Sequence, residues 1–520
     1  MNNKKINIKR ALISCWDKSG LIPLASKLAE AGIEIISSGG TSDYLYKNKI
    51  SVTKVEEITQ FKEFLNGRVK TLHPFVHGAI LARRTPEHLK ELREQNIEPI
   101  DLVIVNLYPF VSHAKKEHSQ SEMIELIDIG GPAMLRAAAK NYEHVVVLHH
   151  PDQYSQFMEM WEQGQHSIPV HESMSLAKEV FFHTAYYDSQ IFQYLESLQT
   201  TGRIPARIAR FYYKSHDLRY GENPHQVAAY FKSLNDDNNS DDHLQQLWGK
   251  EMSYNNYVDV ASAMSLVNEF EEPAVAIIKH TNPCGMAIDS NLCVAFEKAR
   301  AGDPISAFGG IVACNRMVDA ETARLIKETF FECIISPDYS EECLEILQGK
   351  KNLRILKNNS SGYAKSFIEL KAMGAGLLVQ EPDLQTFDSE KLQKVGNRKP
   401  TTAEENDLYF AWKVVKHVKS NAIVFAKNSQ VIGVGAGQMS RVDAVKLARQ
   451  KAETLGHNLH GAVMASDAFF PFRDGIDEAA RAGISAVIQP GGSVRDQEVI
   501  NAIQEHQMAM LLTHMRHFKH

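Results

Sequence analysis

The sequence predicts an α/β protein that begins with a doubly wound domain, and three observations indicate this fold. Apolar runs of strand length lie at residues 11–13, 100–107 and 145–148, and residues 33–36 are expected to start a further strand. Buried parallel strands have unbroken apolar runs of this kind. The segments between these runs carry apolar residues at helical spacing, as crossover helices require. Ligands of such sheets bind beyond the carboxyl ends of the strands, so functional residues are expected there.

The composition indicates several globular units with large cores. The chain has 520 residues, of which 44% are hydrophobic and 23% charged. A net charge of −6 argues against a general nucleic-acid-binding surface. Six cysteines form no C-x-x-C pair, which favours reduced thiols in a cytoplasmic protein. The first apolar run is short and ends at Asp17-Lys18, so neither a signal peptide nor a membrane span is expected.

Helices are expected at residues 21–29, 122–127 and 132–140, where apolar positions recur every three or four residues. Residues 201–217 contain Gly202 and Pro205 and few periodic apolar positions, which predicts a linker. The chain is thereby divided into a domain of residues 1–200 and a second domain of residues 218–520.

The second domain contains a weak internal sequence repeat. An apolar run leads to Lys279 and another leads to Lys427, and each is followed by a turn, a second strand, a helix and a further strand. This repeat predicts two duplicated α/β subdomains, at roughly 218–375 and 376–520. The alternative is that α/β segments in general resemble one another this closely.

Polar segments of the first domain lie beside the predicted strand ends. The SSGGT segment, residues 37–41, opens a helix, where converging backbone N–H groups suit a phosphate, although a plain tight turn fits it as well. The GRVKTLHP segment, residues 67–74, adds two cations, a hydroxyl and an imidazole that would favour the same anion. Tyr108, Asp128 and Lys140 follow in NLYPF, DIGGP and a helix end, and each can act as an acid or base if its pKa is tuned.

The most informative segment of the second domain is KHTNPCG, residues 279–285. His280 at a strand end can take a proton from a nucleophile, and the adjacent Lys279 ammonium can stabilise an oxyanion. The RYGENPHQ segment, residues 219–226, is dense in groups that bind ligands. Three aromatic residues in SDAFFPFRD, residues 466–474, suggest a wall for a planar ring, and Arg516 and Phe518 suggest a docked C-terminus.

Two common chemistries are not supported by the motifs. A zinc nucleobase deaminase needs P-C-x-x-C, but Pro283-Cys284 is followed by Gly-Met-Ala. The glycines of residues 433–437 do not have G-x-G-x-x-G spacing, so no dinucleotide is inferred. No metal site is expected.

Taken in order, the motifs resemble those of the bifunctional purine biosynthesis family that combines AICAR formyltransferase with IMP cyclohydrolase. The resemblance covers essentially the whole chain, from SCWDK at residues 14–18 to the terminal RHF. It implies a methylglyoxal-synthase-like first domain that closes the purine ring of formyl-AICAR with loss of water. It implies two cytidine-deaminase-like subdomains without zinc that transfer a formyl group from 10-formyltetrahydrofolate to AICAR. An obligate homodimer in the cytoplasm is implied as well, and a bound monovalent cation is left open.

The resemblance also implies roles for individual residues. The catalytic residues of ring closure would be Lys70, Tyr108, Asp128 and Lys140, and those of formyl transfer Lys279, His280 and Asn421. The nucleotide of ring closure would be held by Ser14, Lys18, Ser38, Gly39, Gly40, Thr41, Arg68, Thr71, Asn106 and Ile129. AICAR would be held by Arg219, Tyr220, Asn256, Gly309, Glu332, Phe469 and Arg516. The folate would lie near Arg441 and Asp474. Trp16, inside the SCWDK loop, receives no role.

Two other functions compete with this interpretation. A phosphate-sensing module with an inactive second half would bind nucleotide without turnover, but the intact Lys279-His280 pair and Asn421 argue against it. A nucleotide-dependent oxidoreductase would need the dinucleotide fingerprint that the chain lacks.

Overall fold

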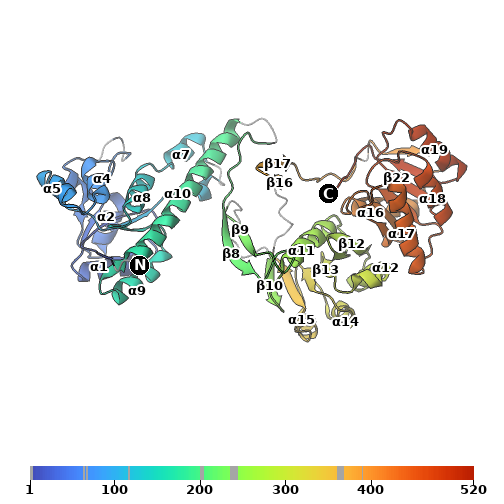
Figure 1. Ribbon diagram of the computed structural model, residues 1–520, viewed down its shortest axis with the longest axis horizontal. Helices are drawn as coiled ribbons and strands as arrows, with labels where there is room; N and C mark the ends of the chain where they lie inside the picture. Colours follow the sequence, from blue (N-terminus) through green and yellow to red (C-terminus); the bar gives the residue numbers. More distant parts are fainter. Residues whose placement is uncertain are drawn as a thin grey trace. The chain divides into compact units, whose positions relative to one another are not determined.

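The computed structural model describes residues 4–62, 65, 68–114, 118–199, 204–234, 244–359, 368–388 and 390–520. The chain divides into two compact units, Met1–Phe211 and Tyr212–His520, and each is described by itself (Figure 1). Among the described residues, no helix has the length and apolar content needed to cross a bilayer.

Unit 1 contains a parallel sheet formed by the predicted apolar runs. Its strands, in spatial order, are β4 (Thr53–Lys54), β3 (Glu34–Ser37), β2 (Arg10–Cys15), β5 (Leu102–Asn106) and β6 (Val146–Leu148). A separate two-stranded pair joins β1 (Lys5–Asn7) to β7 (Ser167–Pro169). Short helices α3 (Val55–Thr59), α5 (Pro86–Glu94), α6 (Phe110–His113) and α7 (Gln120–Glu125) lie in the connections.

Both faces of this sheet are covered, which confirms the predicted doubly wound arrangement. Ala11 and Ile13 of β2 belong to one core, with α1 (Leu21–Glu30) and α9 (Gln153–Gln163). Leu12, between them, belongs to a second core, with α4 (Pro74–Leu81), α8 (Gly130–Lys140) and α10 (Val170–Gln199). Successive side chains of a strand point to opposite faces, so a strand buried on both sides is apolar at every position.

Unit 2 is organised around a twelve-stranded mixed sheet, with the order β10-β15-β14-β13-β11-β12-β20-β19-β21-β22-β23-β18. Its first half consists of β10 (Leu244–Trp248), α11 (Tyr254–Val267), β11 (Ala274–Lys279), β12 (Asn282–Ile288), α12 (Leu292–Gly302), α13 (Pro304–Ala307), β13 (Ile311–Cys314), α14 (Ala320–Glu328), β14 (Cys333–Ser336), α15 (Glu341–Gln348) and β15 (Arg354–Asn358). Its second half consists of β18 (Gln393–Val395), α16 (Thr402–Val415), β19 (Ile423–Lys427), β20 (Gln430–Gly435), α17 (Arg441–Thr454), β21 (Val463–Ser466), α18 (Asp474–Ala482), β22 (Ala486–Gln489), α19 (Asp496–Glu505) and β23 (Ala509–Leu512). Apart from α13, the two halves have the same order of elements.

The duplication extends to individual hydrogen bonds. A capping box starts α11 at Ser253 and another starts α16 at Thr401. Six residues after each cap, a carboxylate accepts both backbone N–H groups of a hairpin turn, Asp259 from His280 and Thr281, and Asp407 from Asn428 and Ser429. All four turn residues have positive φ, between 51° and 63°. The repeat read from the sequence is therefore a true internal repeat.

The two repeats meet where β12 lies beside β20. Ala287 pairs with Gln430, and Ile288 N–H donates to the Ser429 carbonyl at 3.2 Å. On one face of the sheet, α11 and α16 contribute to a single continuous core. On the other face, each repeat has its own core, one with α12 and one with α17. The junction is therefore closely packed on one face only.

Two predicted boundaries differ from the structure. Residues 212–217 were expected in the linker but belong to β8 (Tyr212–Leu218), which pairs with β9 (Ala228–Ser233); residues 201–203 lie outside the described residues. The boundary at 375/376 falls in the turn between β16 (Glu369–Met373) and β17 (Gly376–Gln380), and the second repeat begins at β18. These exposed strands bury neither face, so they lack the apolar pattern on which the prediction relied.

We expect unit 1 to lose stability as the pH falls below about 6.5. The rings of His149, after β6, and His183, on α10, lie 4.7 Å apart, and mainly burial lowers their pKa values to about 3 and about 4. Both rings stay neutral in the folded protein but gain a proton on unfolding once the pH is below 6.5. The stabilisation is thus present above pH 6.5 and is lost as the pH falls toward 4, by about 1.4 kcal/mol per pKa unit. Thermal unfolding from pH 7.5 to 4.5 measures this loss.

His149→Gln should make that pH dependence shallower. His171→Gln is the matched control, because His171 begins the same helix α10 with a side chain that is 64% exposed. Equal slopes for His149→Gln and the unaltered chain would refute the assignment.

Candidate active sites

The predicted residues of unit 1 gather at the carboxyl edge of its sheet. Ser14 lies near the end of β2, and Asn106 ends β5. Ser38 follows β3 and precedes the first turn of α2 (Gly39–Lys47). The Ser38–Thr41 segment therefore presents a helix N-terminus at the edge where open parallel sheets bind ligands.

Glycines bring the later motifs against this edge. A Cβ atom at Gly39 would lie 2.9 Å from Lys70 Nζ, so the Lys70 ammonium lies directly against the start of α2. A Cβ atom at Gly130 would lie 2.9 Å from Thr71 Oγ1. Lys70 and Thr71 are consecutive residues of GRVKTLHP. They thus contact two other motifs of the sequence, SSGGT through Gly39 and DIGGP through Gly130.

Asp128 is the strongest acid–base candidate of unit 1. Burial raises the pKa of its carboxyl, against the lowering effect of hydrogen bonds from the backbone N–H groups of Gly131, Tyr108 and Gly130. The bond from Gly131 N to Asp128 Oδ1 is 2.8 Å long. A carboxyl with a raised pKa can hold or release a proton nearer neutral pH.

Two of the predicted binding residues use their side chains within the protein. The Thr41 hydroxyl accepts from Cys15 N at 3.0 Å and donates to Cys15 O at 2.9 Å. The Asn106 carboxamide accepts from Asp17 N at 2.9 Å and donates to Asp17 O at 2.7 Å. Both side chains therefore fix the SCWDK loop.

The remaining predicted residues of unit 1 lie around these groups. The exposed Arg68 pairs with Glu125, which sequence reasoning missed although Glu125 directly precedes the LIDIGGP run. Lys18 Nζ donates to Trp16 O at 3.2 Å. Ile129, 62% exposed, precedes α8, and the exposed Lys140 ends it.

In unit 2 the Lys279-His280 pair ends β11 and enters the hairpin turn. Lys279 Nζ donates to Phe308 O at 2.7 Å, next to Gly309, which has a φ of 74°. His280 is exposed, and its left-handed backbone conformation is held by Asp259. This conformation is uncommon outside glycine and requires support from neighbouring groups.

A hydrogen-bonded link connects this pair to the second repeat. The Asn282 carboxamide donates to His280 O at 3.0 Å and accepts from Lys419 N at 3.0 Å. Two residues later, Asn421 Oδ1 accepts from Arg441 Nη2 at 2.8 Å, while its amide donates to Gln438 O at 2.8 Å. Asn282 was not singled out by the sequence, although it lies inside KHTNPCG.

Arg441 acts here as a positioning group for Asn421. Its guanidinium is buried and also bonds Ser466 Oγ at 2.9 Å and Asp467 Oδ1 at 2.5 Å. The C-terminal segment docks at the same place, because Ser420 N donates to Lys519 O at 2.9 Å and His517 N donates to Asp467 O at 3.0 Å. The expected docking of the C-terminus is confirmed.

The other predicted residues of unit 2 have the following surroundings. The Asn256 carboxamide oxygen belongs to the capping box of α11, and Glu332 pairs with Arg354 at 2.6 Å. Arg219 covers the Tyr220 ring and donates to its hydroxyl at 2.8 Å, and Arg516 covers Phe518. Asp474 begins α18 and accepts from Gly475 N at 2.8 Å. Of the three aromatic residues in SDAFFPFRD, Phe469 and Phe472 are exposed, but Phe470 is buried in the core and is not part of a wall.

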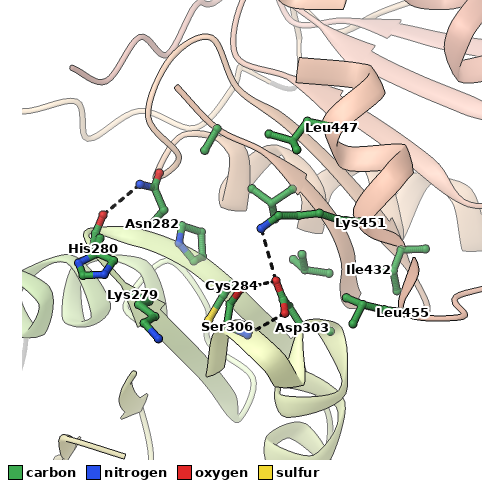
Figure 2. Close-up of a pocket in the computed structure, with 16 residues that line it drawn as sticks. Lys279, His280, Asn282, Cys284, Asp303, Ser306, Ile432, Leu447, Lys451 and Leu455 are labelled. Atoms are coloured by element: carbon green, nitrogen blue, oxygen red, sulfur yellow. Dashed lines mark hydrogen bonds and ion pairs between the residues drawn. The ribbon is translucent and has the colours of Figure 1, made fainter. Parts of the chain in front are cut away.

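A cavity of about 260 Å³ lies at the junction of the repeats, on the face where their cores are separate. Lys451 of α17 pairs with Asp303 at 3.4 Å, and Asp303 caps α13 by accepting from Ser306 N at 2.9 Å. Figure 2 shows both bonds, with the Lys279 side chain directed away from Lys451. The cavity thus lies beside the Lys279-His280 segment, and its ion pair fixes the helix that leads to Phe308.

Each unit thus has a cluster of titratable side chains at strand ends, an arrangement typical of an enzyme. A family model described as AICARFT/IMPCHase bienzyme matches residues 138–451, and one described as MGS-like domain matches residues 20–133. The bifunctional purine biosynthesis protein PurH of Magnetococcus marinus is 50% identical over 99% of both chains, and that of Aquifex aeolicus is 50% identical over 98% of this chain and 100% of its own. The crystal structure of ForH is 35% identical over 36% of this chain, with a TM-score of 0.33.

The chain belongs to the AICARFT/IMPCHase bienzyme family. It is a bifunctional enzyme of purine biosynthesis with AICAR formyltransferase and IMP cyclohydrolase activities, as the motif resemblance predicted.

We expect Arg441→Lys to lower formyl transfer at least tenfold and to leave ring closure unchanged. A lysine cannot bond Asn421 and Asp467 simultaneously with the planar geometry of the guanidinium. The two activities are assayed separately on the same preparation. Arg449→Lys is the control, because Arg449 lies on the same helix and pairs with Glu453 and Glu478 instead. Equal formyl transfer by both variants would contradict the positioning role.

Proposed function

We propose that ring closure takes place in unit 1 and formyl transfer in unit 2. The observation that supports the first assignment best is the contact of Lys70 and Thr71 with glycines of two other motifs, one of which contains Asp128. The nucleotide phosphate would bind the backbone N–H groups of Ser38–Thr41, aided by Lys70 and Arg68. Ser14, Lys18, Gly40 and Ile129 would line the rest of the nucleotide site.

During ring closure, the carboxamide nitrogen of formyl-AICAR attacks the formamide carbon, and water leaves. The site would hold the two groups together, and such proximity can supply about 7–11 kcal/mol of the barrier. Asp128, whose pKa is raised by burial, would exchange protons with the reacting atoms, assisted by Tyr108 and Lys140.

For formyl transfer, the amine of AICAR is a poor nucleophile, because its lone pair is delocalised toward the carboxamide. His280 would take the amine proton as the nitrogen attacks the formyl carbon of 10-formyltetrahydrofolate. Lys279 and Asn421 would stabilise the negative charge that develops on the formyl oxygen, and tetrahydrofolate would leave with a proton. AICAR would lie among Arg219, Tyr220, Asn256, Gly309, Glu332, Phe469 and Arg516, and the folate near Arg441 and Asp474.

We also propose that each repeat of unit 2 is a cytidine-deaminase-like subdomain without zinc chemistry, and that the chain acts in the cytoplasm as a homodimer. The absence of a second cysteine after Pro283-Cys284 supports the first statement. The β16–β17 hairpin supports the second, because it forms a separate two-stranded sheet with Leu370, Leu377 and Leu378 exposed. An isolated hairpin is marginally stable in water, and a second copy of the chain would cover it.

The proposal is tested by mixing the purified chain with AICAR and 10-formyltetrahydrofolate and resolving the products by mass. IMP with an equal amount of tetrahydrofolate is expected. Formyl-AICAR without IMP would contradict the assignment of ring closure to this chain, and the absence of both products would contradict the enzyme assignment.

His280→Ala should abolish formyl transfer and leave the cyclisation of supplied formyl-AICAR intact, whereas Lys70→Ala should do the reverse. Loss of a general base typically costs about 10²–10⁴-fold in rate. Each variant carries its own control for folding, because the other unit must remain active. Loss of both activities in a folded variant would show that the two-site assignment is wrong.

A further inference from the structure

Trp16 lies at the carboxyl edge of the unit 1 sheet with half of its indole in solvent. Its side chain is 51% exposed, and that of the neighbouring Tyr108 is 42% exposed. The two rings form an edge-to-face pair with centroids 5.1 Å apart and an interplanar angle of 71°. Large aromatic rings gain most from burial, so two adjacent exposed rings at a site edge point to an apolar ligand surface.

The backbone below Trp16 is held firmly. Asn106 clamps the next residue, Asp17, through both its N–H and its carbonyl, at 2.9 and 2.7 Å. Asp17 Oδ1 also accepts from Ser19 N at 2.8 Å, and Lys18 Nζ donates to Trp16 O. The indole therefore projects from a fixed loop, although its own side chain is not buried.

Tyr108 is fixed from the other side. Phe110, two residues later, is fully buried, and the Tyr108 backbone N–H lies close enough to the Asp128 carboxyl to lower its pKa. The aromatic pair is thereby attached to the same groups that hold the proposed acid–base residue. A planar heterocycle that reacts beside Asp128 would have the indole and the phenol within reach.

We propose that Trp16 and Tyr108 form an aromatic wall that packs against the planar imidazole or purine ring of the nucleotide during ring closure. This proposal rests on the assignment of ring closure to unit 1. Phosphate contacts at Ser38–Thr41 anchor one end of the nucleotide, and the wall fixes the plane of its base. Because the two ring planes lie 71° apart, the base stacks on one ring and contacts the other edge-on. Stacking tolerates differences between bases, because each presents a π face, so the same wall serves substrate and product.

The test uses the intrinsic fluorescence of Trp16 with IMP as the probe. IMP should quench tryptophan emission in the unaltered chain and in Trp248→Phe, and this quenching should disappear in Trp16→Phe. Trp248→Phe is the matched control, since Trp248 is 37% exposed on β10 of unit 2. Unchanged quenching in Trp16→Phe would overturn the proposal.

Steady-state kinetics distinguish direct packing of Trp16 against the nucleotide base from a merely structural role of Trp16. Trp16→Ser should raise the KM for formyl-AICAR about tenfold with little change in kcat, and Trp16→Phe should restore most of the affinity. A lower kcat at unchanged KM would overturn the wall and make Trp16 a positioning residue for Tyr108. Formyl transfer in the same preparations reports correct folding. If Lys70→Ala also leaves ring closure intact, the site assignment fails; if only Trp16→Ser has no effect, the wall alone fails.

Discussion

The contact between β12 and β20 is the interaction on which unit 2 depends. It makes one sheet of two repeats through the pairing of Ala287 with Gln430. The shared core of α11 and α16 supports it, and so does a buried ion pair between Glu269 and Lys416, at 3.0 Å. Lys416 and His417 both bond Glu269, and they hold the pKa of that carboxyl at about 2 despite its burial. Removal of one partner of a buried pair leaves an uncompensated charge, so the loss of either Glu269 or Lys416 would strongly destabilise this junction.

At the same junction, the proposed chemistry would draw on groups from both repeats. The two hairpin turns have the same backbone and the same carboxylate support, yet only the first carries an imidazole, His280, where the second has Asn428. The second repeat contributes Asn421 and its Arg441 support instead. The two repeats thus share one backbone scaffold, and they differ in a few side chains next to the junction. Asn282 links the His280 turn to the second repeat, because it donates to His280 O and accepts from Lys419 N.

Sequence reasoning succeeded where burial dictates residue type and failed where it does not. The runs at β2, β5 and β6 were found because strands buried on both faces must be apolar throughout. The β8–β9 and β16–β17 hairpins were missed because their exposed strands have no such pattern. For the sites, the sequence motifs identified candidate side chains but not the residues to which those side chains form hydrogen bonds. Nothing in the sequence shows that Thr41 and Asn106 would hold the SCWDK loop, or that Arg441 would hold Asn421, because these bonds join residues far apart in the chain.

Three departures from local rules lie at the two proposed sites. His280 and Thr281 occupy left-handed turn positions that favour glycine or asparagine, Asp128 is a largely buried carboxyl, and Trp16 leaves half of an indole in water. Each choice costs folding free energy, and each has a specific support that maintains it: Asp259 below the turn, backbone N–H groups around Asp128, and Asn106 below the Trp16 loop. Conflicts between local preference and fold are expected where function selects the residue. Asp259 belongs to the repeated scaffold, because Asp407 supports the second turn in the same way. Asn106 and Asn282, by contrast, hold the backbone beside Trp16 and His280, next to the groups proposed to meet the substrate.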